Sequence, residues 1–151
     1  MSATQQQFCT FVIQGILFGV EVEKVQEVIR HQGMTAVPLA PNVVAGLINL
    51  RGQIVTAIDL RRRLGVNNRT AGDLPMNVVV RTGDGAVSLL VDEIGDVVEV
   101  QEQDFEQAPD TLDSTSRDLV RGVYKLKNEL LLVLDTGKAV NADESGIRKP
   151  D

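Results

Sequence analysis

The sequence of 151 residues has one cysteine, one histidine and no tryptophan. A single cysteine, Cys9, excludes an internal disulfide, and one cysteine with one histidine does not supply the ligands of an ordinary zinc site. We interpret Cys9 as an inert thiol buried in a strand. We interpret His31, which follows Arg30 at the predicted end of a strand, as an exposed loop residue.

Long hydrophobic runs are also missing. No stretch approaches the roughly 18 apolar residues that a membrane-spanning helix needs. The first residues, MSATQQQF, lack the basic and apolar regions of a secretion signal. We therefore expect a soluble cytoplasmic protein that does not insert into a membrane.

Basic and aromatic residues are few. The chain has 15 Lys and Arg against 21 Asp and Glu, a net charge of −6, and only four Phe and one Tyr. A general nucleic-acid binder needs a basic face, and base stacking needs aromatic side chains. We expect no nucleic-acid partner.

No catalytic set is recognisable either. Adjacent acidic pairs such as Asp92/Glu93 and Asp143/Glu144 point to opposite faces of a strand, so they do not converge on a substrate. The segment Gly83-Asp84-Gly85 is not a phosphate loop, because no GK pair and no helix follow it. The run Arg61-Arg62-Arg63 is interpreted as a solvated helix face, with contact to an acidic partner as the alternative. We expect no enzyme activity, no metal and no cofactor.

What the chain does contain is a repeat. Residues 46–60, GLINLRGQIVTAIDL, align without gaps with residues 122–136, GVYKLKNELLLVLDT, which places Gly46 on Gly122 and Asp59 on Asp135. An earlier pair, VEKVQEVI at 22–29 and VDEIGDVV at 91–98, supports the repeat. Such a repeat predicts one structural unit used twice. Because an aspartate ends both copies, we interpret it as a cap for the following turn rather than a catalytic group.

Short valine-rich strands separated by turn residues are predicted along the chain. Arg51-Gly52 and Lys127-Asn128 are predicted hairpin turns, with positive φ at Gly52 and Asn128. The polar segment 66–75 is a predicted linker. The predicted strands cover 8–14, 17–22, 46–50, 53–60, 78–81, 87–91, 97–100, 124–126 and 129–134, with a tight turn and a strand over 23–30 and short helical turns at 41–45, 61–64 and 113–119.

This pattern predicts an all-β fold with a few short helices, built as two barrels of about five strands. We place the first subdomain at about 8–66, the second at about 76–140 and a frayed polar tail at 141–151, within one domain of 1–151. A unit of this size buries limited apolar surface on its own, so the halves should share an apolar contact. The residues predicted for that contact are Leu47, Ile48, Leu130, Leu131 and Leu132.

Glu27 and Arg51 are charged residues among apolar neighbours, so each must be exposed at a strand edge or paired. We hypothesise that the two side chains approach each other on the surface of the first unit. The alternative is two independent solvated side chains.

Four segments carry a resemblance to a known family. They are FGVEVEKVQEVIR at 18–30, AVPLAPNVVAGLINLRGQIVTAIDLRRRLG at 36–65, LLVDEIGDVVEV at 89–100 and, more weakly, RGVYKLKNELLLVLDT at 121–136. From about residue 8 to residue 140 the chain resembles the CheW-like coupling domain of bacterial chemotaxis. The resemblance implies two intertwined five-stranded barrels of the SH3 type with a hydrophobic seam. It also implies a non-enzymatic adaptor that joins the cytoplasmic tip of methyl-accepting chemoreceptors to the regulatory domain of the histidine kinase CheA.

The resemblance implies two contact regions. A groove between the barrels would take the apolar stripe of a receptor helix, with charged residues at its rim. The receptor-binding residues would be Val25, Glu27, Val28, Ile48, Leu50, Arg51, Leu90 and Val91, and the kinase-binding residues Gly52, Asp59 and Arg62.

Two alternatives to this function remain open. One is the coupling domain of a larger signalling protein, such as a CheV-type adaptor or a kinase regulatory domain, and the other is a small β-barrel ligand-binding protein or hydrolase.

Overall fold

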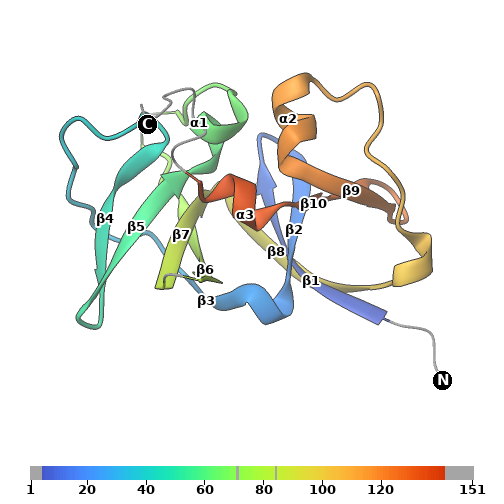
Figure 1. The fold of residues 1–151 in the computed structure, drawn as a ribbon, viewed down its shortest axis with the longest axis horizontal. Helices are drawn as coiled ribbons and strands as arrows, with labels where there is room; N and C mark the ends of the chain where they lie inside the picture. Colours follow the sequence, from blue (N-terminus) through green and yellow to red (C-terminus); the bar gives the residue numbers. More distant parts are fainter. Residues whose placement is uncertain (1–4, 71, 84, 142–151) are drawn as a thin grey trace.

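The computed structural model describes residues 5–70, 72–83 and 85–141. Two five-stranded sheets lie side by side along the longest axis of the molecule, with the short helices near the junction and at the ends of strands (Figure 1). The elements, in chain order, are β1 (Gln5–Ile13), β2 (Ile16–Glu21), the 3-10 helix η1 (Val22–Lys24), β3 (Val25–Ile29), β4 (Val44–Leu50), β5 (Gln53–Asp59), α1 (Leu60–Leu64), β6 (Met76–Thr82), β7 (Gly85–Val91), β8 (Glu93–Gln101), the 3-10 helix η2 (Glu102–Asp104), α2 (Ser114–Leu119), β9 (Val120–Lys125), β10 (Leu130–Leu134) and α3 (Thr136–Ala139).

The two sheets have the same plan. The first sheet has the strand order β8-β1-β2-β10-β9, and the second has the order β3-β6-β7-β5-β4. When each strand of the first sheet is replaced by its equivalent in the other copy, so that β1 becomes β6 and β8 becomes β3, the strand order of the second sheet results. Each sheet has one parallel pair, β2 with β10 and β5 with β7, at the equivalent place. The repeat in the sequence is therefore a repeat in the fold, as predicted.

The two copies exchange their first hairpins. The β1–β2 hairpin pairs with β8 and β10 from the second half of the chain, and the β6–β7 hairpin pairs with β3 and β5 from the first half. The fold is intertwined, as expected. The sequential division at about 8–66 and 76–140 does not describe the sheets, because each sheet draws strands from both segments.

Three apolar clusters form the core. One cluster, around Phe8 and Leu131, is formed by residues of the first sheet and packs on its inner face. Another, around Ile48 and Val79, packs on the inner face of the second sheet. The largest cluster draws buried residues from both sheets and from α1, α2 and α3, with Phe11, Ile58 and Leu132 among its members. This shared cluster is the hydrophobic seam between the two units.

Only part of the predicted contact lies in the seam. Leu132 does, but Ile48 and Leu131 belong to the two inner clusters, and Leu130 is exposed. Leu47 is half-buried and pairs with Thr35. The assignment was wrong for these four because successive residues of a strand point to opposite faces, and β4 and β10 carry apolar residues on both faces.

Glycine recurs at position 46 and position 122 for a steric reason. In each copy a loop crosses the strand and forms an isolated bridge with the residue after the glycine, Thr35 with Leu47 and Glu106 with Val123. A Cβ atom added at Gly46 would lie 2.7 Å from the Thr35 carbonyl oxygen. At Gly122 it would lie 2.6 Å from the Glu106 carbonyl oxygen. Only glycine allows the loop to approach so closely.

The repeated aspartates are helix caps, as predicted. The Asp59 carboxylate accepts a hydrogen bond from the Arg61 amide at 2.9 Å at the start of α1. The Asp135 carboxylate accepts one from the Lys138 amide at 3.1 Å at the start of α3. Asp113 caps α2 in the same way, through the Ser116 amide.

The two predicted hairpin turns differ. Arg51 and Gly52 have φ of 51° and 89°, which fits a tight turn with two left-handed residues. The prediction of a positive φ at Asn128 was wrong, because this residue does not have one. Asn128 therefore does not take the role that Gly52 has in the first hairpin. The predicted helical turn at 41–45 is a single turn closed by the Val44 amide and the Pro41 carbonyl, after which β4 has already begun.

Cys9 and His31 are both half-buried. Cys9 is therefore less buried than predicted. Its partial burial still raises the pKa of the thiol, which favours the uncharged form. His31 lies in a loop as predicted, but it is less exposed than expected. No helix of the described residues is long and apolar enough to span a membrane. The predicted tail lies outside the described residues from position 142 onward.

Candidate protein-interaction site

Glu27 and Arg51 contact each other, as hypothesised. The Arg51 guanidinium donates a hydrogen bond to the Glu27 carboxylate, and the two groups form an ion pair. The Arg51 side chain is 70% exposed, whereas that of Glu27 is 22% exposed. An exposed pair of this kind contributes only about 0.2–1 kcal/mol to folding. Its charges therefore remain available to a partner.

The turn between β4 and β5 holds Arg51 in place. The side chain of Asn49 accepts a hydrogen bond from the Gly52 amide at 2.8 Å, and this bond stabilises the turn. Gly52 is exposed, and its φ of 89° strongly favours glycine. Arg51 is therefore presented from a rigid hairpin rather than from a mobile loop.

The predicted receptor-binding residues fall into two groups. Val25 and Glu27 are half-buried, and Val28 and Arg51 are exposed, so these four lie at the surface of the second sheet. The other four are each less than 10% exposed and belong to the core, so their side chains are not available for direct contact: Ile48, Leu50, Leu90 and Val91.

The predicted kinase-binding residues are not equally accessible. Gly52 is exposed, and the Arg62 side chain is 35% exposed while its guanidinium donates a hydrogen bond to the Asn42 carbonyl at 3.0 Å. Asp59 is buried, and its carboxylate forms an ion pair with Arg69 at 3.1 Å. Asp59 therefore supports the corner structurally.

The run of three arginines is not a solvated face, so that interpretation was wrong. Arg61 donates two hydrogen bonds to the Asp92 carboxylate, at 2.7 and 2.8 Å, and Arg69 forms an ion pair with the same group at 3.2 Å. Arg63 is buried and donates to the Lys138 carbonyl at 2.6 Å. The carboxylate that binds Arg61 comes from the end of β7, 31 residues away, which the sequence does not reveal.

These contacts change the acidity of Asp92. Burial acts to raise the pKa of its carboxyl group, but hydrogen bonds from Arg61 and the Gln14 amide and the charges of Arg61 and Arg69 outweigh burial and lower the pKa. The network joins α1, the linker and the β7–β8 corner, and it has a structural role.

A groove runs beside α3, where the two sheets meet. Two overlapping cavities of about 590 Å³ each share Thr82, Gly137 and Val140 as lining residues. At one end the groove reaches Lys24, and at the other it reaches the exposed residue Ile54 next to the β4–β5 turn. The groove between the two units was expected, but these lining residues were not named, because β5 and α3 meet only in the folded chain.

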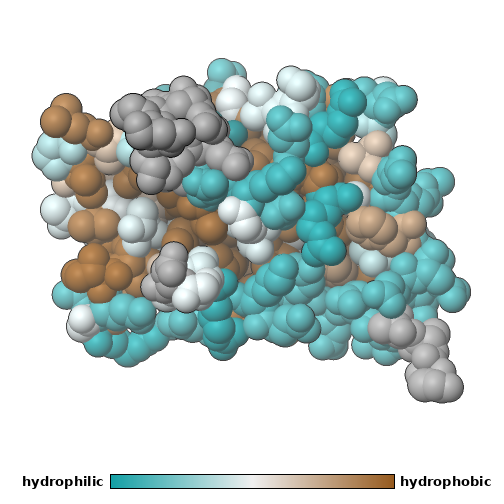
Figure 2. All heavy atoms as spheres, in the orientation of Figure 1, coloured by the Kyte–Doolittle hydropathy of each residue, from teal (hydrophilic) through white to brown (hydrophobic). Residues whose placement is uncertain are grey.

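Apolar surface gathers at the end of the molecule that β4 and β5 form, whereas the opposite end is largely hydrophilic (Figure 2). Exposed apolar residues of these strands and of the loop before β4 include Val37, Leu39 and Ile54. Exposed apolar patches rimmed by charge are typical of surfaces that bind other proteins. Among the described residues, no group of His, Cys, Asp and Glu is arranged to hold a metal ion.

Comparison with known proteins agrees with this picture. The CheW-like domain family matches residues 7–144. The chain is 28% identical over 148 residues to the chemotaxis protein CheW of Bacillus subtilis (strain 168), covering 98% of this chain and 95% of that protein. It is 28% identical over 144 residues to the chemotaxis protein CheW of Treponema pallidum (strain Nichols), covering 93% and 85%. The crystal structure of the scaffolding protein TtCheW from Thermoanaerobacter tengcongensis superposes with a TM-score of 0.77 and 27% identity, covering 87% of this chain and 90% of that one.

Proposed function

The chain belongs to the CheW-like domain family, and on that premise we propose that it is a non-enzymatic adaptor that couples methyl-accepting chemoreceptors to the histidine kinase CheA. The observation that carries the proposal is the family match over 7–144, because it takes in all ten strands except the first two residues of β1, and thus both interlocked sheets. Relatives carry the names chemotaxis protein and scaffolding protein. The adaptor works in the cytoplasm, at receptor arrays in the membrane, and acts by binding.

The receptor contact uses the groove beside α3 and the charged hairpin next to it. A receptor tip is helical, and a helix docks its apolar stripe into an apolar groove. Ile54, Val87 and Val140 supply apolar lining. Glu27 and Arg51 lie near the Ile54 end of the groove, where rim charges set orientation and association rate. Val25 and Val28 add apolar contact from β3.

The kinase contact uses the apolar end that β4 and β5 form. Gly52 and Arg62 are accessible there, and Val37 and Leu39 in the loop before β4 are exposed. Asp59 contributes by holding the corner from which Arg62 projects. The two contacts lie close together, so that binding of one partner can influence the other through the β4–β5 hairpin.

Titration distinguishes this function from that of a small-molecule carrier. The chain is titrated by calorimetry with a receptor-tip helical hairpin and, separately, with the regulatory domain of CheA, and a blind screen of small-molecule ligands is run in parallel. We expect saturable binding of both proteins. Binding of neither protein, together with a tight small-molecule hit in the groove, would assign the groove to a ligand instead.

A further inference from the structure

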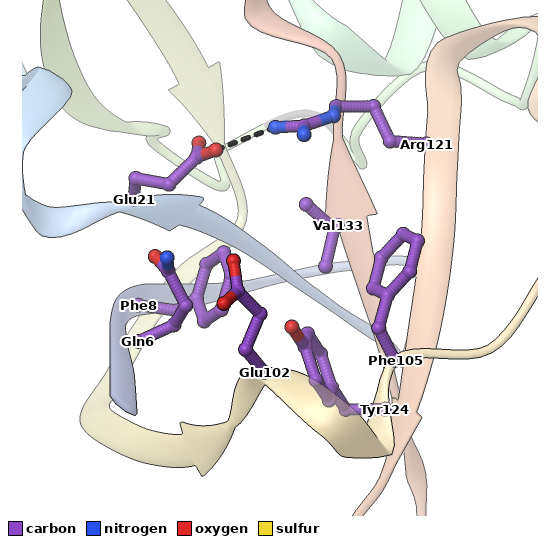
Figure 3. Close-up of a pocket in the computed structure, with 8 residues that line it drawn as sticks. All are labelled: Gln6, Phe8, Glu21, Glu102, Phe105, Arg121, Tyr124 and Val133. Carbon is purple, nitrogen blue, oxygen red and sulfur yellow. Dashed lines mark hydrogen bonds and ion pairs between the residues drawn. The ribbon is translucent and has the colours of Figure 1, made fainter. Parts of the chain in front are cut away.

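A cavity of about 180 Å³ opens in the first sheet, away from the hairpin that carries Arg51. Its walls come from β1, β2, β9, β10, η2 and the residues just after η2 (Figure 3). The volume suits one amino-acid side chain. This part of the molecule is not among the contact regions proposed above, so the inference goes beyond the proposed function and is tested separately.

Three aromatic rings form much of the wall. The rings of Phe105 and Tyr124 have centroids 5.3 Å apart in an edge-on arrangement, and those of Phe8 and Tyr124 have centroids 5.7 Å apart. The chain has five Phe and Tyr residues, and these three are the ones outside the Phe11–Phe18 stack. Aromatic faces attract cations through their negative quadrupole.

The polar groups of the cavity carry an unmatched negative charge. The Tyr124 hydroxyl group points into the cavity (Figure 3). The Glu102 carboxylate points to the same space and forms no ion pair in the described part of the chain. Glu21, in contrast, is paired with Arg121 at 2.5 Å. The cavity therefore offers a carboxylate and a hydroxyl oxygen as hydrogen-bond acceptors for a cationic group.

We propose that this cavity receives the side chain of an arginine from a partner protein. A guanidinium group is planar and stacks on aromatic rings, and it donates hydrogen bonds in several directions at once. Here it stacks on the ring of Phe105, which is 41% exposed, and donates to the Glu102 carboxylate and to the Tyr124 hydroxyl oxygen. A neutral side chain of the same shape leaves Glu102 without a counter-charge.

The test compares two side chains of nearly the same shape, because citrulline has an uncharged ureido group, with an oxygen in place of one NH2 group, where arginine has a guanidinium. The ¹⁵N-labelled full chain is titrated with N-acetyl-arginine amide and with N-acetyl-citrulline amide, and amide shifts are followed by NMR. We expect the arginine compound to shift Gln6, Phe105 and Tyr124 with a dissociation constant on the order of 1 mM. The citrulline compound should bind at least about tenfold more weakly. Equal affinities, or no shift at these residues, would overturn the proposal.

Two variants locate the interaction. Glu102→Gln removes the charge and Tyr124→Phe removes the hydroxyl group, and each should weaken the arginine compound by about fivefold to tenfold with a native spectrum retained. Asp104→Asn removes a charge from the same 3-10 helix without lining the cavity, and should change affinity by less than about twofold. An equal loss in Asp104→Asn would show general electrostatics and contradict the proposal. Tighter binding of free arginine than of the blocked compound would point to a free amino acid and contradict it too.

Discussion

Arg51 donates a hydrogen bond to Glu27 across the open side of the second sheet. Arg51 follows β4 and Glu27 lies in β3, and these strands are the two edges of the sheet order. Among the described residues the two strands form no ladder with each other, so the sheet is a barrel that is not closed by backbone hydrogen bonds. The ion pair and the apolar cluster of Ile29, Ile48 and Leu50 bring its edges together.

Reversing the charge of Arg51 tests the proposed contact. Arg51→Glu should leave the fold intact, because an exposed ion pair contributes little to stability. It should weaken binding of the receptor tip by about tenfold or more, because like charges then meet at the rim. Calorimetric titration measures the affinity, and thermal unfolding checks the fold.

The repeat provides the matched control. Lys127 is the equivalent of Arg51 in the second copy and is also exposed, so Lys127→Glu makes the same change in charge on the other hairpin. We expect normal receptor binding in that variant. If both variants weaken binding equally, net charge rather than the Arg51 hairpin controls the interaction.

The two equivalent glycines should both be sensitive to a methyl group. Gly46→Ala and Gly122→Ala each place a Cβ atom against the backbone of a crossing loop, and should destabilise the protein by about 1–3 kcal/mol. Gly33→Ala is the control, since a Cβ atom at that position has no neighbour within 4 Å. Urea unfolding measures the three free energies, and values for the two equivalent glycines no larger than that for Gly33→Ala would refute the steric explanation.

Ile58 tests the shared core. Its side chain is 1% exposed and lies in the cluster to which both sheets contribute. Ile58→Asp should cost several kcal/mol, because an unpaired charge would be buried. The control is Ile54→Asp, which has the same change on the same strand at a residue that is 61% exposed. Far-UV circular dichroism during heating should show unfolding at a much lower temperature for Ile58→Asp alone, and a normal melting temperature would disprove the strand assignment.

Asp92 gives an acid-dependent stability. Its pKa is lowered in the folded state, so its contribution is complete above the unfolded pKa of about 3.9 and is lost as pH falls through the lower folded value. Asp92→Asn should therefore lower the free energy of unfolding at pH 7 by about 1–3 kcal/mol and reduce its fall below about pH 4. Urea unfolding at several pH values measures both effects. An unchanged pH profile in Asp92→Asn would exclude this role for the carboxylate.

The sequence predicted the repeated unit, the turns at Arg51-Gly52 and the aspartate caps, because those depend on short-range patterns. It did not predict which strand faces meet. In β10, Leu131 and Val133 face the inside of the first sheet while Leu132 and Leu134 face the seam, and all four are apolar. Where both faces of a strand are buried, alternation of polarity disappears and the two faces cannot be told apart.

The candidate site was predicted in part for the same reason. The contact of Glu27 with Arg51 followed from two charges in apolar surroundings, and it is present. Ile48, Leu50, Leu90 and Val91 were assigned to a groove because they are apolar, but such residues also fill cores. The groove beside α3 and the cavity at Tyr124 join segments far apart in the chain, so no local pattern indicates them.

The most direct measurement of the proposed adaptor role is co-sedimentation of CheA with vesicles that contain a chemoreceptor. The amount of kinase in the pellet is measured as the concentration of this chain is raised, with Arg51→Glu in a parallel series. The account predicts that the chain brings the kinase to the vesicles in a saturable way, and that Arg51→Glu needs about tenfold more protein for the same effect. A pellet whose kinase content does not change when the folded wild-type chain is added would contradict it.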